Sequence, residues 1–176
     1  ERGSWIELEV GKKDILTVRI DQSGKLPATC FLRALSDEYT NDEDIIRLFH
    51  ETETVKISDY SSATKLRGRY TVEKIINPQT GEIVLEAGRQ ISDTTIKAII
   101  DLEIKKIEVI NKLDDPLILN SLESDFTKSH EDALLKIYVR FRPGNPQQVE
   151  KAKQLFYDKF FDAKRYRLGS VGRFRL

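Results

Sequence analysis

The segments Trp5-Ile-Glu-Leu-Glu-Val10 and Ile15-Leu-Thr-Val-Arg-Ile20, joined by Gly11-Lys-Lys-Asp14, decide how the fold begins. Each flanking segment alternates apolar and polar residues, which is the period of a strand with one buried face. The four residues between them have the composition of a tight turn. The pattern therefore predicts a β-hairpin over residues 5–20.

The first strand of this hairpin divides its side chains between two faces. Positions 6, 8 and 10 are expected to face the core, and positions 5, 7 and 9 to form the polar face. Trp5 would then be an exposed ring beside Arg2, suited to stacking on an unpaired base. Alternatively, Trp5 packs under a neighbouring loop or another domain. The residues alone leave both interpretations open.

Beyond the hairpin, helical patterns and capping residues predict helices over residues 27–35, 40–50, 131–141 and 146–160. The second helix should bury Ile45, Ile46 and the pair 48–49. Ser129 is expected to cap the third helix, and Asn145 the fourth, with Pro146 at its first position.

A self-contained pattern occupies the middle of the chain. Two strands around the turn 77–81, a helix from Ser92 to about Leu102 and a strand over 106–110 predict a ββαβ unit. We therefore expect an α+β fold, in which residues 1–60 and 115–176 form a core domain. Residues 61–114 would form an inserted ββαβ subdomain.

Composition excludes several classes of protein. The chain has 176 residues and no apolar run approaching the roughly 20 residues of a membrane-spanning helix. A single cysteine, Cys30, excludes a disulfide framework and a cysteine-based zinc site. No signal segment opens the chain, so a cytoplasmic location is expected. The absence of methionine suggests a piece of a longer polypeptide.

The zero net charge conceals a basic C-terminal block. Residues 136–176 carry eleven Lys and Arg against three acids, a balance of 11 − 3 = +8. Such a block can face phosphate. It can equally be a solvated face near a chain end, or pair with the acidic segment 36–60.

Signals of catalysis are few. The chain has no glycine-rich phosphate loop, nucleophile elbow or His-Glu-x-x-His motif. His50 and His130 stand alone, and Cys30 lies in an apolar helical pattern typical of core. The acids 42–44 suit the positive end of a helix dipole better than a metal site. No catalytic residue and no metal ligand is expected in this segment.

Two sets of motifs resemble the lobe (domain 2) of the beta subunit of bacterial DNA-directed RNA polymerase. They occur in order at the two ends of the chain: Arg2-Gly-Ser-Trp5, Val18-Arg-Ile-Asp21, Lys25-Leu-Pro-Ala-Thr29, Leu32-Arg-Ala-Leu35, Arg142-Pro-Gly144, Phe160-Phe-Asp162, Arg165-Tyr166 and Val171-Gly-Arg173. Residues 66–111 resemble, less tightly, a lineage-specific insert of that lobe.

The resemblance implies DNA-binding residues. Trp5 would stack on an unpaired base of the non-template strand, and Arg142 and Arg165 would approach the backbone of that strand. Lys25 and Arg173 are secondary candidates. The family usually carries arginines where this chain has Gln22-Ser-Gly24, so only Lys25 remains as a candidate at that turn.

The implied function is one wall of the DNA cleft, which would help hold downstream DNA and the non-template strand during RNA synthesis. The whole enzyme would be a magnesium-dependent nucleotidyltransferase of the cytoplasm, associated with the nucleoid, whereas this segment would hold no cofactor. Expected partners are DNA, the alpha, beta-prime and omega subunits, and sigma and regulatory factors. The alternative is a free-standing α+β protein-interaction module, which a scattered distribution of the basic residues would favour.

Overall fold

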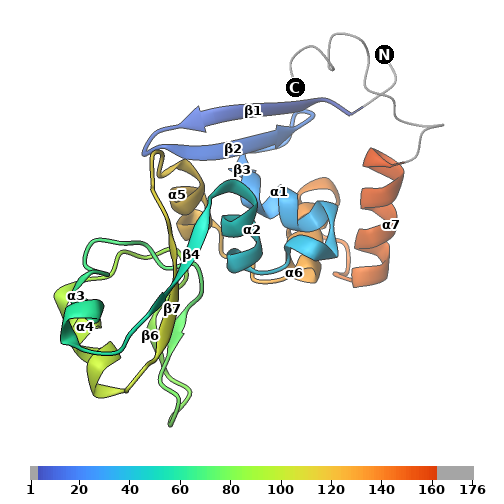
Figure 1. Ribbon diagram of the computed structural model, residues 1–176. Coiled ribbons are helices and arrows are strands. Elements are labelled where there is room, and N and C mark those ends of the chain that lie inside the picture. The colour runs from blue at the N-terminus through green and yellow to red at the C-terminus, as the bar shows by residue number, and fades with distance from the viewer. Residues whose placement is uncertain (1–3, 162–176) are drawn as a thin grey trace. The chain divides into compact units, whose positions relative to one another are not determined.

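The computed structural model describes residues 4–161 (Figure 1). The chain divides into two compact units: unit 1 combines Glu1–Asn41 with Asn120–Leu176, and unit 2 is Asp42–Leu119. Helix α5 (Leu117–Ser124) crosses the second boundary. Helices and small antiparallel sheets make up both units, which confirms the expected α+β class.

The predicted hairpin is confirmed. Strands β1 (Ile6–Gly11) and β2 (Ile15–Ile20) pair antiparallel, and the two-residue strand β3 (Leu26–Pro27) adds to the other side of β2. Lys13 and Asp14 adopt positive φ angles of 69° and 52°. Tight hairpin turns require such left-handed residues, so these two residues reverse the chain.

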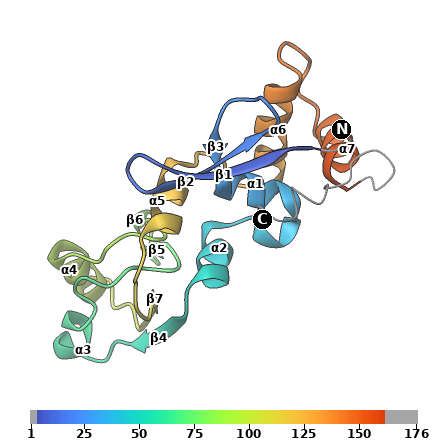
Figure 2. The ribbon, with the colours of Figure 1, turned by 90° about the horizontal axis from the view of Figure 1, so that it is seen from above.

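Helices build the rest of unit 1. Helix α1 (Ala28–Leu35) packs on β2, β3 and α6 (His130–Phe141), and α6 packs beside α7 (Val149–Phe160), as Figure 2 also shows. A 3-10 turn, η1 (Asp37–Tyr39), follows α1. The core between them is formed by Val18, Ile20, Leu26, Cys30, Ala34, Ala133, Leu134, Ile137, Tyr138, Ala152 and Phe156.

The expectation that positions 6, 8 and 10 of β1 face the core is wrong for positions 8 and 10. Leu8 and Val10 are 54% and 56% exposed, whereas Val18, the partner of Leu8 on β2, is fully buried. The reason is that β1 is the edge strand, and the covering helix α1 packs on β2 and β3. The alternation of apolar and polar residues predicted strand β1 correctly. It could not show which strands of the sheet helix α1 covers.

The predicted start of α7 is also wrong. The residue before the helix is Gln148 and makes no side-chain capping bond. The Asn145 N–H instead donates to the Arg142 carbonyl oxygen at 3.3 Å, beside Gly144 with φ +83°. Asn145 therefore closes the preceding turn, and α7 begins at Val149. The predicted cap of α6 is confirmed, because Ser129 accepts from the N–H of Asp132.

Unit 2 contains the predicted ββαβ elements and more. Its elements are α2 (Asp42–Phe49), β4 (Thr52–Lys56), α3 (Tyr60–Thr64), β5 (Ile75–Ile76), β6 (Ile83–Leu85), α4 (Asp93–Asp101) and β7 (Lys106–Ile110). The hairpin β5–β6, the Ser92-capped α4 and the strand β7 were expected, although β5 is shorter than predicted. Strand β4 and helix α3 were not expected, and β4 pairs antiparallel with β7.

The core of unit 2 lies among these elements and includes Leu66, Ile91, Ile99 and Val109, all at most 1% exposed. Ile45 and Ile46 of α2 are buried as expected, but the expected burial of Leu48 and Phe49 is wrong, because both are about half exposed. The two compact units are defined by contacts within the chain, whereas the predicted boundaries separate a core domain from an insert. The predicted domain boundaries near residues 60 and 115 therefore stay a prediction.

Candidate nucleic-acid interface

Trp5 is held through its backbone. Its N–H donates to Asp21 Oδ1 at 2.8 Å, and its carbonyl oxygen accepts from the Asp21 N–H at 2.6 Å. Asp21 closes this pair of bonds in a left-handed conformation with φ 53°, which Asp tolerates better than most residues. The indole remains 39% exposed, and its Nε1 lies 3.3 Å from Glu7 Oε1. The backbone is thus fixed while part of the ring stays accessible.

Asp21 also connects Trp5 to the ends of α6 and α7. Its second oxygen, Oδ2, forms an ion pair with Lys159 Nζ at 2.5 Å. The same ammonium lies 4.5 Å from the centroid of the Phe141 ring, a cation–π contact. Because Phe141 directly precedes Arg142, this chain of contacts links two of the predicted DNA-binding positions in one part of unit 1.

Arg142 follows the last residue of α6 and is exposed. Its Nη1 donates to the Phe141 carbonyl oxygen at 3.2 Å, a bond that helps satisfy the end of the helix. A guanidinium carries five donors, so this bond leaves most of them for another acceptor. Among residues 4–161 no carboxylate forms an ion pair with Arg142.

Two more cations of α6 lie on one side of the helix. Lys136 and Arg140 are one turn apart, and in the described part of the chain neither forms an ion pair. A Cβ added to Gly24 would lie 2.6 Å from Arg140 Nη1, so the guanidinium rests against the turn that follows β2. Arg140 thereby brings a positive charge to the turn 22–24, which lacks arginines of its own.

Unlike Lys136, Arg140 and Arg142, Lys25 forms an ion pair within the described part of the chain. Its ammonium forms an ion pair with Glu9 at 2.6 Å across the sheet. The hydrogen bond and the charge of Lys25 hold the pKa of the Glu9 carboxyl below its ordinary value. A phosphate would compete with Glu9 for this lysine, which keeps Lys25 a secondary candidate.

Arg165 and Arg173 lie outside the described residues, as does Arg175. Of the basic residues of the block that the structure does describe, Lys136 and Arg140 lie on α6, Arg142 directly follows this helix, and Lys151, Lys153 and Lys159 lie on α7. The described part of the block is therefore divided between two neighbouring helices of unit 1.

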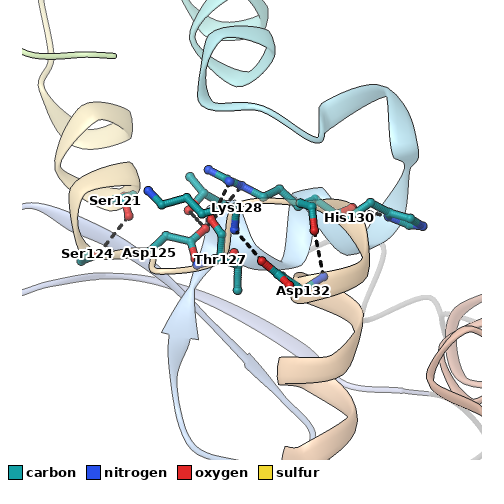
Figure 3. Close-up of polar contacts among 10 residues, drawn as sticks. Ser121, Ser124, Asp125, Thr127, Lys128, His130 and Asp132 are labelled. Atoms are coloured by element: carbon teal, nitrogen blue, oxygen red, sulfur yellow. Dashed lines mark hydrogen bonds and ion pairs between the residues drawn. The ribbon is translucent and has the colours of Figure 1, made fainter. Parts of the chain in front are cut away.

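The sequence did not predict a buried polar cluster that joins α1 to the loop between α5 and α6 (Figure 3). Arg33 is fully buried, and its Nη1 donates to the Thr127 carbonyl oxygen at 2.6 Å. Asp125, 2% exposed, accepts from Thr29 Oγ1 at 2.8 Å and from Thr127 Oγ1 at 2.6 Å. Its Oδ2 lies 3.6 Å from Arg33 Nε.

This polar cluster ties the loop to α1. His130, at the first position of α6, adds a bond between its Nδ1 and the Arg33 carbonyl oxygen at 2.6 Å. The spacing Asp125-x-Thr127 is typical of a side chain that bonds the backbone two residues on, and was a signal available in the sequence. That signal does not reveal Arg33 as the partner, which comes from 92 positions earlier in the chain (125 − 33).

Residues 4–161 contain neither a metal-binding cluster nor a membrane-spanning helix. No group of three or more His, Cys, Asp or Glu side chains is arranged to hold a metal ion there. None of the helices in this range has the length and apolar character needed to cross a membrane. Cys30 is fully buried in the core of unit 1, as predicted, and burial raises the pKa of its thiol to about 11.

Comparisons with known proteins agree on one family. Residues 97–176 match the family model described as RNA polymerase Rpb2, domain 2. The DNA-directed RNA polymerase subunit beta of Rhodopirellula baltica is 49% identical in an alignment that covers 100% of this chain and 14% of that protein. The protein of the same name from Leptospira biflexa is 36% identical over 99% of this chain and 14% of its own length. That of Geobacter sp. is 32% identical over 99% of this chain and 17% of its own length. The chain thus spans about one seventh of the length of the first two relatives.

Proposed function

This chain belongs to the DNA-directed RNA polymerase beta-subunit family, as a segment that includes its Rpb2 domain 2, and on that premise we propose that it forms one wall of the DNA cleft. In this role it helps hold downstream duplex DNA and the non-template strand of the transcription bubble.

One observation carries the proposal: an accessible tryptophan is connected through Asp21 and Lys159 to the end of α6, where Arg142 has no carboxylate partner among residues 4–161. Trp5 supplies a ring on which a base can stack, and stacking accepts any base because every base has a π-face. Arg142 supplies donors for phosphate oxygens, which give affinity without reading sequence. Together these two groups suit a strand whose bases are unpaired.

The segment acts within a larger enzyme. We propose that the complete polypeptide works in a magnesium-dependent nucleotidyltransferase with alpha, beta-prime and omega subunits, and that the magnesium ligands lie outside this segment. Sigma and regulatory factors would meet the assembled enzyme, in the cytoplasm and associated with the nucleoid. Arg165 and Arg173 remain candidate DNA contacts by resemblance, and Lys25 a secondary one.

The test is Trp5→Ala in the complete beta subunit, assembled into polymerase with its sigma factor. Loss of one stacked base should shorten the lifetime of the open promoter complex at least about fivefold. Elongation on a preformed scaffold should be almost unchanged, because the bubble is already open there and does not have to be formed at a promoter. The measurement is the decay of heparin-challenged complexes.

Two matched variants serve as controls. Trp5→Phe retains a ring and should recover most of the lifetime, whereas Tyr60→Ala removes a 67% exposed ring from unit 2 and should have no effect. Unchanged lifetimes of Trp5→Ala complexes on promoters with each of the four bases at the start site would contradict the proposal.

A further inference from the structure

A surface hollow of about 430 Å³ lies on α6 and on the loop that precedes this helix. Its lining includes Phe126, Leu135, Lys136, Val139, Arg140 and Gln147. All of these residues lie in unit 1, and none of them is a predicted DNA-binding residue. We call this site the Phe126 hollow.

Phe126 is presented to solvent by a rigid loop. Its ring is 82% exposed, whereas its neighbours Asp125 and Thr127 are 2% and 5% exposed. Asp125 Oδ1 accepts from both the N–H and the Oγ1 of Thr127, at 3.0 and 2.6 Å. Because the residues on both sides are buried and bonded, the Phe126 side chain is held outward. A ligand that covers this ring removes apolar surface from water, which favours binding.

Cations flank the apolar part of the hollow. Val139 is 38% exposed beside Lys136 and Arg140, which are separated along the α6 axis by about 6 Å. Neither cation forms an ion pair among residues 4–161. The lining also contains one acidic residue, Asp132. Its Oδ2 accepts a hydrogen bond from the Lys128 N–H at 3.3 Å, just before the start of α6.

We propose that the Phe126 hollow binds an unpaired nucleotide of single-stranded DNA. The base stacks on Phe126 and contacts Val139, and the adjoining phosphates are bound by Lys136 and Arg140. This inference rests on the proposed function and adds a second stacking site to that of Trp5. An acidic peptide would also suit the two cations, but an apolar anchor of a peptide favours an enclosed pocket, whereas a base needs an open ring.

Cross-linking in the assembled polymerase identifies the occupant directly. The complete beta subunit carries p-benzoylphenylalanine in place of Phe126, and the probe is a promoter fragment with a pre-opened bubble and a labelled non-template or template strand. Irradiation of the open complex should transfer the DNA label to the beta subunit. Cross-links to protein alone, or none, would overturn the inference.

Affinity supplies the second measurement. Phe126→Ala should weaken binding of the bubble fragment about fivefold to tenfold, and Phe126→Trp should retain it. Lys136→Ala with Arg140→Ala should lower the salt dependence of binding, and Tyr60→Ala is the control. The inference requires both the DNA cross-link and the loss of affinity.

The two proposals fail separately. If Trp5→Ala shortens the open-complex lifetime and Phe126→Ala has no effect on affinity, the Phe126 hollow is not a nucleotide site and the proposed function stands. If neither variant has an effect, both proposals fail. Normal assembly of the Phe126→Ala enzyme, measured by its sedimentation, excludes misfolding as the cause of a loss.

Discussion

Arg142 is the residue whose proposed contact can be tested by salt alone. Its guanidinium is exposed and has no carboxylate partner among residues 4–161. Each neutralised phosphate of single-stranded DNA contributes about 0.7 to the slope of log K against log salt. Arg142→Ala should therefore lower the slope for promoter binding by about 0.7, measured by filter binding at several salt concentrations.

The control for this slope is Arg67→Ala. Arg67 is 58% exposed but is paired with Asp93 in unit 2, so its removal should leave the slope unchanged. An unaltered slope for Arg142→Ala would mean that Arg142 is not near a phosphate. Its side chain would then only stabilise the end of α6, through its bond to the Phe141 carbonyl oxygen.

The reactivity of the Cys30 thiol tests how well the core of unit 1 excludes solvent. It is the only cysteine in the chain, it is fully buried, and the pKa of its thiol is raised to about 11, chiefly by burial. The reactive thiolate is therefore scarce at pH 8 and inaccessible. A disulfide reagent should leave the native protein unmodified for hours and react within seconds in denaturant. Rapid modification of native protein would show that the core of unit 1 opens readily.

The cluster of Arg33, Asp125 and Thr127 joins α1 to the loop between α5 and α6. Both charged side chains are almost completely inaccessible. Removing the carboxylate of such a buried pair takes the opposite charge away from the buried guanidinium, at a cost of about 3–5 kcal/mol. Asp125→Ala should lower the free energy of unfolding of unit 1 by this amount, measured by urea with Cys30 reactivity as the probe.

The double variant Arg33→Met, Asp125→Leu separates the charge effect from packing. It removes both charges together and should be less destabilising than Asp125→Ala. Asp114→Asn is the control, because the pair Lys112–Asp114 is at least 75% exposed on both sides and should contribute under about 1 kcal/mol. Equal losses in Asp125→Ala and the double variant would show that packing, and not the unpaired charge, dominates.

The stability of unit 2 should depend on pH through the ion pairs of Arg47. This guanidinium binds Glu108 at 2.7 Å and also Glu73, joining α2 to β7 and to the segment before β5. The hydrogen bond from Arg47 lowers the pKa of Glu108 below its ordinary value of 4.5. The resulting stability is present above pH 4.5 and is lost as the pH falls through the lower pKa of the folded protein.

Arg47→Met should therefore destabilise unit 2 by about 1 kcal/mol at pH 7 and should reduce the further loss of stability on acidification. The measurement is urea unfolding of the 176-residue chain at pH 7 and below pH 4.5, followed by circular dichroism. Lys74→Met, a change of the same kind in the same unit, is the control. An identical acid response in Arg47→Met and the unaltered chain would contradict the role of Arg47.

Local patterns predicted what depends on neighbours in the chain. The alternation of residues 5–20 and the capping serine at 129 correctly predicted a hairpin and the start of α6, because turns and caps are satisfied within a few residues. The same is true of Ser92 and α4. Family membership was also indicated by short motifs, since these keep their order and spacing.

Tertiary structure decided what depends on distant partners. The exposure of Leu8 and Val10 follows from which strand α1 covers, and β4 exists because β7 lies opposite it more than fifty residues later. The candidate site has the same origin. Trp5 was predicted from its motif, whereas the link from Asp21 to Lys159 and the bond from Arg33 to Thr127 join residues 138 (159 − 21) and 94 (127 − 33) positions apart. Side-chain period within a segment carries no information about such partners, so only the folded chain determines them.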